Sequence, residues 1–123
     1  MQDVTGLSFA VTSGTTYRFY ALINYTAGTA ATGSRWSING PATTLLSYTS
    51  RYALSTTSQT LNFATAYDTP AGCSATSAAT AGNIAIIEGI IIPSANGTVI
   101  VRFASELTTQ AIVAKAGSTL EWW

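Results

Sequence analysis

The stretch from Asn83 to Ile92 is almost continuously apolar, and it restricts the fold more than any other part of the chain. A short apolar run that ends at turn residues, here Pro93 to Gly97, is typical of a strand covered on both faces. A two-layer β-sandwich buries only one face of each of its sheets. One face of this strand therefore needs a cover from outside the domain, and it carries either Ile84, Ile86, Ile90 and Ile92 or Ile87 and Ile91.

The other segments also have the two-residue periodicity of strands. From Thr16 to Tyr25 apolar and aromatic residues occupy every second position, and further strands are predicted near 7–11, 35–38, 43–52, 59–66, 98–104, 111–115 and 119–123. Gly, Pro, Asn and Ser-Thr clusters separate them, and no segment has convincing helical periodicity. The 123 residues are thus predicted to form a single all-β domain, residues 1–123, an antiparallel β-sandwich built as a jelly roll of about eight strands. Thr69 to Gly82 is predicted to be a surface loop that carries binding contacts or covers a neighbouring segment.

The turn at Pro93–Gly97 suggests a hairpin between the apolar strand and the strand from Thr98 to Ala104. With a five-residue loop, Glu88 lies opposite Arg102, and opposite charges across two strands stabilise a sheet by roughly 0.2–1 kcal/mol. A two-residue Asn-Gly turn would separate the two charges. We expect the longer loop, with Glu88 and Arg102 as a structural pair.

Composition excludes several classes of protein. Lys plus Arg equal Asp plus Glu at 5 each, and only 8% of residues are charged, which leaves no basic patch for nucleic acid. The chain has no His, so it lacks a Ser-His-Asp or Cys-His catalytic unit and the commonest zinc ligand. Its single cysteine, Cys73, cannot form an internal disulfide. No apolar run approaches the roughly 20 residues of a membrane span, and the first residues do not resemble a signal peptide.

Residues with reactive side chains do not form a catalytic pattern. Asp68, Glu88 and Glu106 have no spacing that groups two carboxylates for glycoside hydrolysis. Cys73 has no basic neighbour in sequence that would lower its pKa, so an incidental thiol is favoured over a reactive one. We expect no enzymatic activity, no cofactor and no metal site.

A loose cluster of aromatic residues beside an arginine is the best candidate for ligand binding. Tyr48, Arg51, Tyr52 and Tyr67 suit stacking on a sugar and recognition of its hydroxyls, and equally suit an ordinary protein interface. The alternative is that these rings pack on the faces of the sheet.

The chain closes with Trp122 and Trp123, two large rings whose exposure costs solubility unless something buries them. Because side chains alternate along a strand, only one of them can point into its own sandwich. The other is a candidate for a contact with another subunit. Together with the apolar face of the Asn83–Ile92 strand and the very low charge, this predicts a stable homo-oligomer.

Several segments also resemble a known family. They are 14–19, 23–25, 33–41, 88–90, 96–99, 102–106 and 116–120, which read GTTYRF, INY, GSRWSINGP, EGI, NGTV, RFASE and AGSTL. Together they resemble a domain of tailed-bacteriophage virion proteins, often found at the C-terminus of tail or fibre proteins. More distantly, the order of these turn motifs is similar to the trimeric jelly-roll heads of the C1q and tumour-necrosis-factor type.

The resemblance implies a trimeric structural protein that is assembled in the cytoplasm of the host bacterium and displayed on the virion, in contact with other virion proteins. It implies no catalytic residue. No collagen-like or coiled-coil stalk precedes the domain, so both a capsid decoration or head fibre and an excised tail-fibre tip remain open. A carbohydrate-binding or host-receptor-binding module, with a host surface glycan as partner, is the alternative from another functional class.

Overall fold

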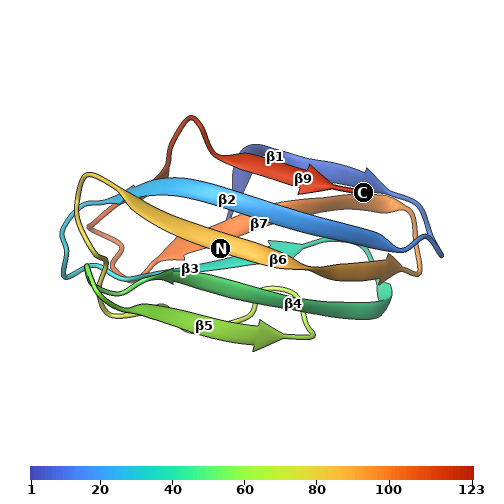
Figure 1. Ribbon diagram of the computed structural model, residues 1–123, viewed down its shortest axis with the longest axis horizontal. Coiled ribbons are helices and arrows are strands. Elements are labelled where there is room, and N and C mark those ends of the chain that lie inside the picture. Colours follow the sequence, from blue (N-terminus) through green and yellow to red (C-terminus); the bar gives the residue numbers. More distant parts are fainter.

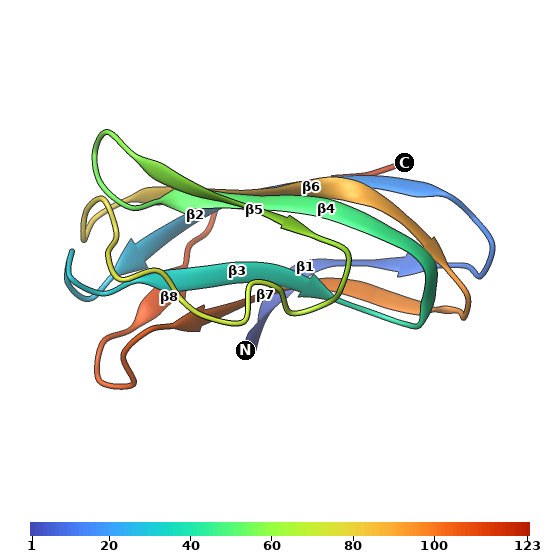
Figure 2. The same ribbon diagram turned by 90° about the horizontal axis from the view of Figure 1, so that it is seen from below.

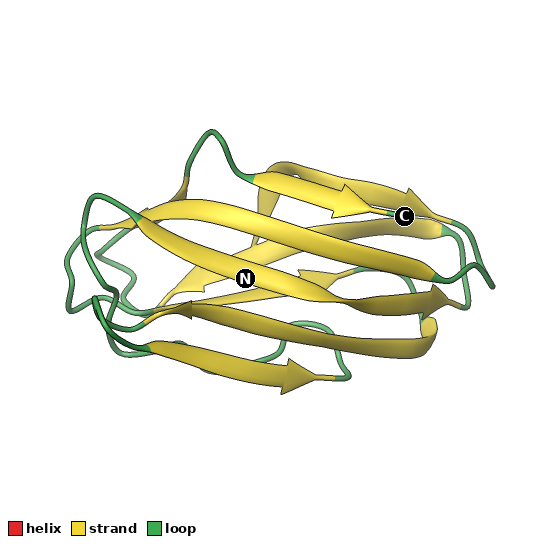
Figure 3. Cartoon of the chain, in the orientation of Figure 1, coloured by secondary structure: helices red, strands yellow, loops and turns green.

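A computed structural model describes all 123 residues and contains nine β-strands and no helix (Figures 1 and 3). The strands are β1 (Gln2–Val11), β2 (Tyr17–Ala27), β3 (Ser34–Asn39), β4 (Thr43–Ala53), β5 (Gln59–Ala64), β6 (Asn83–Pro93), β7 (Gly97–Ser105), β8 (Ile112–Ala114) and β9 (Thr119–Trp122). The predicted all-β class is confirmed. No helix here is long and apolar enough to cross a membrane.

The strands form two antiparallel sheets that face each other as the layers of a sandwich (Figure 2). The smaller sheet has the order β1-β7-β3, and the larger has the order β5-β4-β6-β2-β8, with β9 also paired to β2. The chain crosses between the sheets at each step from β1 to β4 and again from β6 to β8, as in a jelly roll. β4, β5 and β6 follow one another within the larger sheet, as do β8 and β9.

Alternation along the strands decides which side chains form the core. In β2 the predicted face holds Phe19, Ala21, Ile23 and Tyr25, which are all buried between the sheets. Trp36 of β3 fills the centre of the core, where its ring stacks on Phe103 with centroids 5.1 Å apart. Burial of these large apolar surfaces is the main source of stability in a sandwich of this size.

β1 begins earlier than the sequence pattern indicated, because a bulge interrupts its alternation. Its pairing with β7 shifts register between Asp3 and Ser8, and Gly6 lies there with φ of 88°. A positive φ suits glycine, which has no Cβ to collide with the backbone. The bulge carries the strand on to the N-terminus.

The predicted hairpin between β6 and β7 is wrong. β6 pairs with β2 and β4, and β7 pairs with β1 and β3, so the turn from Pro93 to Gly97 crosses from one sheet to the other. Asn96 does not build a two-residue turn either, since its side-chain oxygen accepts a hydrogen bond from the Ser13 amide at 2.9 Å. Both edges of β6 are already paired along most of its length, which leaves no edge for β7.

Glu88 and Arg102 therefore lie in different sheets, and their predicted pairing is also wrong. Glu88 faces Arg51 at 3.6 Å. Arg102 instead joins Asp68 at 2.7 Å and Asp3 at 3.0 Å and donates to the Met1 carbonyl oxygen at 3.0 Å. The cation thus ties the N-terminus, β7 and the long loop together.

The long loop after β5 covers the free edge of β3. The Ser74 amide donates to the Ser34 carbonyl oxygen at 2.9 Å, and the Ser34 amide donates to the Ser74 hydroxyl at 3.0 Å. Further along the edge, the Asp68 amide donates to the Ile38 carbonyl oxygen at 3.1 Å. Of the two roles predicted for this segment, covering a neighbour is the one that the hydrogen bonds establish, and it closes an edge open to other strands.

Candidate functional site: the outer face of the larger sheet

The four residues predicted to bind a ligand do not come together. Tyr48 and Tyr52 point into the core and are almost fully buried, whereas Arg51 between them points to the opposite side of the sheet. Tyr67 lies in the loop after β5, where its hydroxyl donates to the Pro41 carbonyl oxygen at 2.7 Å. The prediction is wrong because residues 48 and 52 share one face of β4 and residue 51 has the other. The alternative of sheet-face packing holds for the two buried rings.

Burial of these tyrosines makes stability depend on alkaline pH. Burial raises the pKa of Tyr52 and that of Tyr67 to about 12. It also raises the pKa of Tyr25 and Tyr48. In the unfolded chain tyrosines ionise near pH 10, so the unfolded state loses these protons at a lower pH than the folded state does. Above pH 10 this ionisation stabilises the unfolded state relative to the folded state. The contribution of these protonated tyrosines to the free energy of unfolding is fully present below about pH 10 and is lost as the pH rises toward 12.

We predict that the free energy of unfolding, measured in urea, falls steadily between about pH 9.5 and 11.5. Tyr67→Phe is expected to make this fall shallower. Tyr17→Phe is the matched control, because hydrogen bonding from Thr12 lowers the pKa of this partly buried tyrosine and its contribution has the opposite sign. A free energy of unfolding that stays constant across this range would contradict the burial of the four phenols.

The carboxylates and the thiol each have their own structural partner. Asp68 binds Arg102, Glu88 faces Arg51, and Glu106 accepts a hydrogen bond from the Gly33 amide at 2.9 Å. The three acidic groups lie at separate places. Burial raises the pKa of the Cys73 thiol, which favours the unreactive protonated form.

The face of the larger sheet that points away from the smaller sheet is the candidate functional site, and we call it the outer face. On β6 it carries Ile84, Ile86, Glu88, Ile90 and Ile92, while Ile87 and Ile91 lie in the core. Ile84 is 55% exposed and Ile90 is 41% exposed. Of the two alternatives for the uncovered face, the one with Ile84 is therefore correct.

The register of the strands sets the side chains of the outer face in rows. One row runs Tyr20, Glu88, Thr49 and Phe63 across β2, β6, β4 and β5. The adjacent row runs Leu22, Ile86, Arg51 and Leu61. In these rows apolar and aromatic groups thus lie on β2, β6 and β5, and the polar Thr49 and Arg51 of β4 lie between β6 and β5. At the edge strand β5, Phe63 is 77% exposed and Leu61 is 50% exposed.

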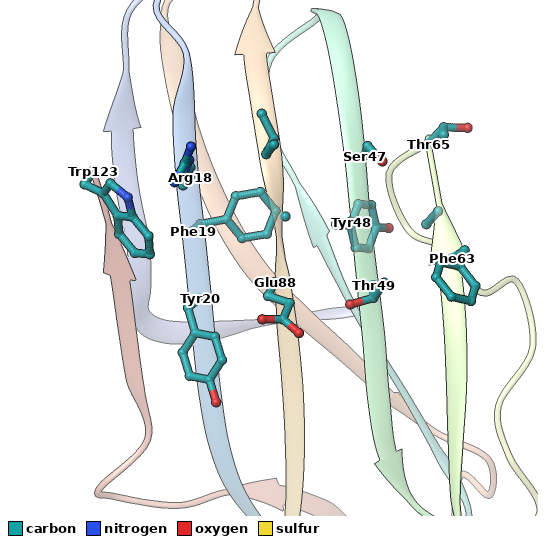
Figure 4. A pocket seen from close by; sticks show the side chains of 13 residues that line it. Arg18, Phe19, Tyr20, Ser47, Tyr48, Thr49, Phe63, Thr65, Glu88 and Trp123 are labelled. Atoms are coloured by element: carbon teal, nitrogen blue, oxygen red, sulfur yellow. The ribbon is translucent and has the colours of Figure 1, made fainter.

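An open trough of about 640 Å³ lies on this face (Figure 4). Trp123 stands at one side and Phe63 at the other, with Tyr20, Glu88 and Thr49 between them. Its volume lies within the range of sites for small molecules, and its lining mixes aromatic rings with hydroxyls and two opposite charges.

The two terminal tryptophans have different places. Trp122 stacks on Phe9 at the side of the sandwich, with ring centroids 5.2 Å apart, and remains half exposed. The backbone of Trp123 continues the pairing with β2 through two hydrogen bonds to Arg18, of 2.9 and 3.1 Å. Its ring is 62% exposed and lines the trough. Trp123 is thus the ring available to another molecule.

Sequence reasoning missed Phe63, Tyr20 and Arg18 as residues of this site. The alternation of β2 already put Arg18 and Tyr20 on the side opposite the core, so that pattern was the signal for both. Phe63 had no such signal, because the position of β5 at the edge of the sheet follows only from the topology. Neither a protein-family model, nor a curated protein, nor a solved structure matches this chain, so the site is defined by its own geometry.

Proposed function

We propose that the protein is a trimeric, non-catalytic structural component of a phage particle and that its subunits associate through the outer face of the larger sheet. The observation that supports this most is the aliphatic row of β6, which lies at the middle of the sheet and leaves Ile84 and Ile90 exposed. Exposed apolar surface rimmed by polar groups, here on both sides of Glu88, marks sites of protein association.

The composition of the outer face suits contact with further copies of the same chain. The strands of this face carry two positive side chains, Arg18 and Arg51, and two negative ones, Glu88 and Glu121, so opposite charges are available on both copies of a contact. Trp, Tyr and Arg are the residues that dominate binding energy at interfaces, and the trough contains all three types. Ile84, Ile86, Ile90, Ile92 and Trp123 remain the proposed contact residues, and Trp122, stacked on Phe9, contributes at the rim.

The likeness of the turn motifs to tailed-phage virion domains supports the placement on a particle. It gives a role in capsid decoration, a head fibre or a tail-fibre tip, with assembly in the bacterial cytoplasm and other virion proteins as neighbours. All of these roles require a rigid β-domain that associates with other proteins through its surface, and none of them requires an active site.

A second candidate function, binding of a neutral glycan, is favoured by the trough. Sugar rings stack on aromatic faces, and Trp123 and Phe63 offer such faces at its two sides. Glu88, Arg18 and the hydroxyl of Thr49 lie between them as donors and acceptors. A glycan array separates the two functions: selective binding that Trp123→Ala abolishes and Trp122→Ala preserves favours the glycan.

The proposed subunit contact is tested by placing charge on the apolar row. Ile84→Glu combined with Ile90→Glu is expected to weaken trimer formation by at least about 100-fold, because carboxylates at the centre of an interface lose their hydration. Sedimentation equilibrium measures this change. Ile100→Glu is the matched control, since Ile100 lies on the outward side of the smaller sheet and is expected to leave the trimer intact. Equal association of both variants would contradict the proposal.

A further inference from the structure

Each sheet edge except that of β5 carries a feature that blocks pairing with another strand. The long loop covers β3, a bulge and Asp3 interrupt β1, Glu121 lies in β9, and β8 has only three residues. β5 is the last strand of the larger sheet and lies at its border (Figure 1). Charged residues, prolines and bulges usually protect an exposed edge from pairing. The sequence of β5, QTLNFA, contains none of the three.

The hydrogen-bonding groups of this edge follow from the pairing with β4. The Leu54 amide donates to the Ser58 carbonyl oxygen at 2.9 Å, so residues 54 and 58 form a hydrogen-bonded pair. Such pairs alternate in an antiparallel ladder, so residues 60, 62 and 64 also bond to β4. The amides and carbonyls of Gln59, Leu61 and Phe63 therefore point away from the sheet, and no other group of the chain bonds to them.

The geometry points to pairing of this edge with β5 of a second copy, antiparallel and about a two-fold axis at Asn62. In this register Leu61 lies opposite Phe63 of the second copy, and the symmetry repeats the contact. The outward backbone donors and acceptors of each strand meet those of the other. Pairing of the two edges also covers Leu61 and Phe63, the two most exposed apolar side chains of the strand, which then form a cross-strand aliphatic-aromatic pair.

Charge also favours a second copy as the occupant of the edge. The nearest charged side chain on the outer face is Arg51, in the same row as Leu61. The proposed register places Arg51 in one row with Thr49 of the second copy and not with the other Arg51. In the alternative register, with Leu61 opposite Leu61, the two arginines share a row and Phe63 faces the polar Gln59.

This contact goes beyond the face contact of the proposed function and does not depend on it. The face contact joins subunits through β6, whereas the edge contact extends the larger sheet from one copy into the next. A two-fold edge contact is isologous, so it joins subunits in pairs and adds to the trimer.

Amide hydrogen exchange, resolved by residue in NMR spectra, tests the edge contact on the unmodified chain. Relative to their intrinsic rates, the amides of residues 61 and 63 are expected to exchange at least about 100-fold more slowly in the associated protein than in Phe63→Lys. Thr60 and Asn62 serve as internal references, since their amides bond to β4 in either case. Fast exchange at Leu61 and Phe63 beside protected references would overturn the inference.

Cysteine cross-linking tests the register. In a Cys73→Ser background, Asn62→Cys is expected to oxidise to a covalent dimer, because residues facing each other in a non-hydrogen-bonded pair lie within disulfide distance. Leu61→Cys is the matched control. In the proposed register the two residues 61 are diagonal neighbours across the strands, about 7–8 Å apart. Adding Ile84→Glu and Ile90→Glu is expected to leave the cross-link, which separates this inference from the proposed trimer. Cross-linking at 61 rather than 62 would overturn the register, and cross-linking at neither would overturn the contact.

Discussion

Trp36→Ala is expected to lower the free energy of unfolding by about 3–5 kcal/mol, which is a large part of the stability of a domain of this size. The indole is fully buried between the sheets and contacts Tyr25 and Phe103, with ring centroids 4.8 and 5.1 Å away. Its Nε1 also donates to the Ser34 hydroxyl at 3.0 Å. The substitution removes the ring contacts and leaves a cavity that the two sheets cannot close. Urea denaturation of the variant measures the loss.

Trp122→Ala is the control for this prediction, because it removes the same side chain from a half-exposed place. Its ring has one aromatic neighbour, Phe9, and water on its other side. The expected loss is about 1 kcal/mol, near that of a single aromatic pair. Equal losses for the two tryptophans would show that the core is not centred on Trp36.

Gly89→Val is the second change with a large expected effect. A Cβ at residue 89 would overlap the Ser47 carbonyl oxygen and lie 2.7 Å from Tyr48 Cα, and both groups belong to the backbone of β4. The strands β4 and β6 must then separate at the middle of the larger sheet. We expect a loss of about 3 kcal/mol or more, since overpacking that displaces backbone costs at least as much as overpacking that displaces side chains.

Gly72→Val is the matched control for Gly89→Val. Gly72 lies in the long loop with open space where its Cβ would stand, and its φ is not in the left-handed region. Its replacement is expected to change the free energy of unfolding by less than about 0.5 kcal/mol. A well-folded Gly89→Val variant with unchanged stability would contradict the close approach of β4 and β6.

The sequence predicted the strands well because alternation is a local property. Phe19, Ala21 and Ile23 are inward in the structure, as their spacing indicated, and the almost continuous apolar run of β6 is the central strand of the larger sheet. The run also predicted an uncovered isoleucine face. The pairing partners of β6 decide which of its two faces lies outward. In the structure Ile84 and Ile90 are on the outward face.

Most of the errors concern pairing between distant segments, which local spacing does not encode, and one comes from alternation within a single strand. Glu88 and Arg102 fit a hairpin, but β6 finds its partners in β2 and β4, which lie far from it in sequence. Tyr48, Arg51 and Tyr52 are close in sequence, yet a strand sends neighbouring side chains to opposite faces. The exposed position of Phe63 follows only from the place of β5 in the strand order.

Sedimentation equilibrium of the unmodified protein at micromolar concentration tests the central claim most directly. The proposed trimer, in which subunits bury the isoleucine face together, predicts a mass of three 12.8 kDa chains, or a multiple of three where the β5 edges have also paired. A single species with the mass of one chain would contradict the claim, because Ile84 and Ile90 would then face water in the native state.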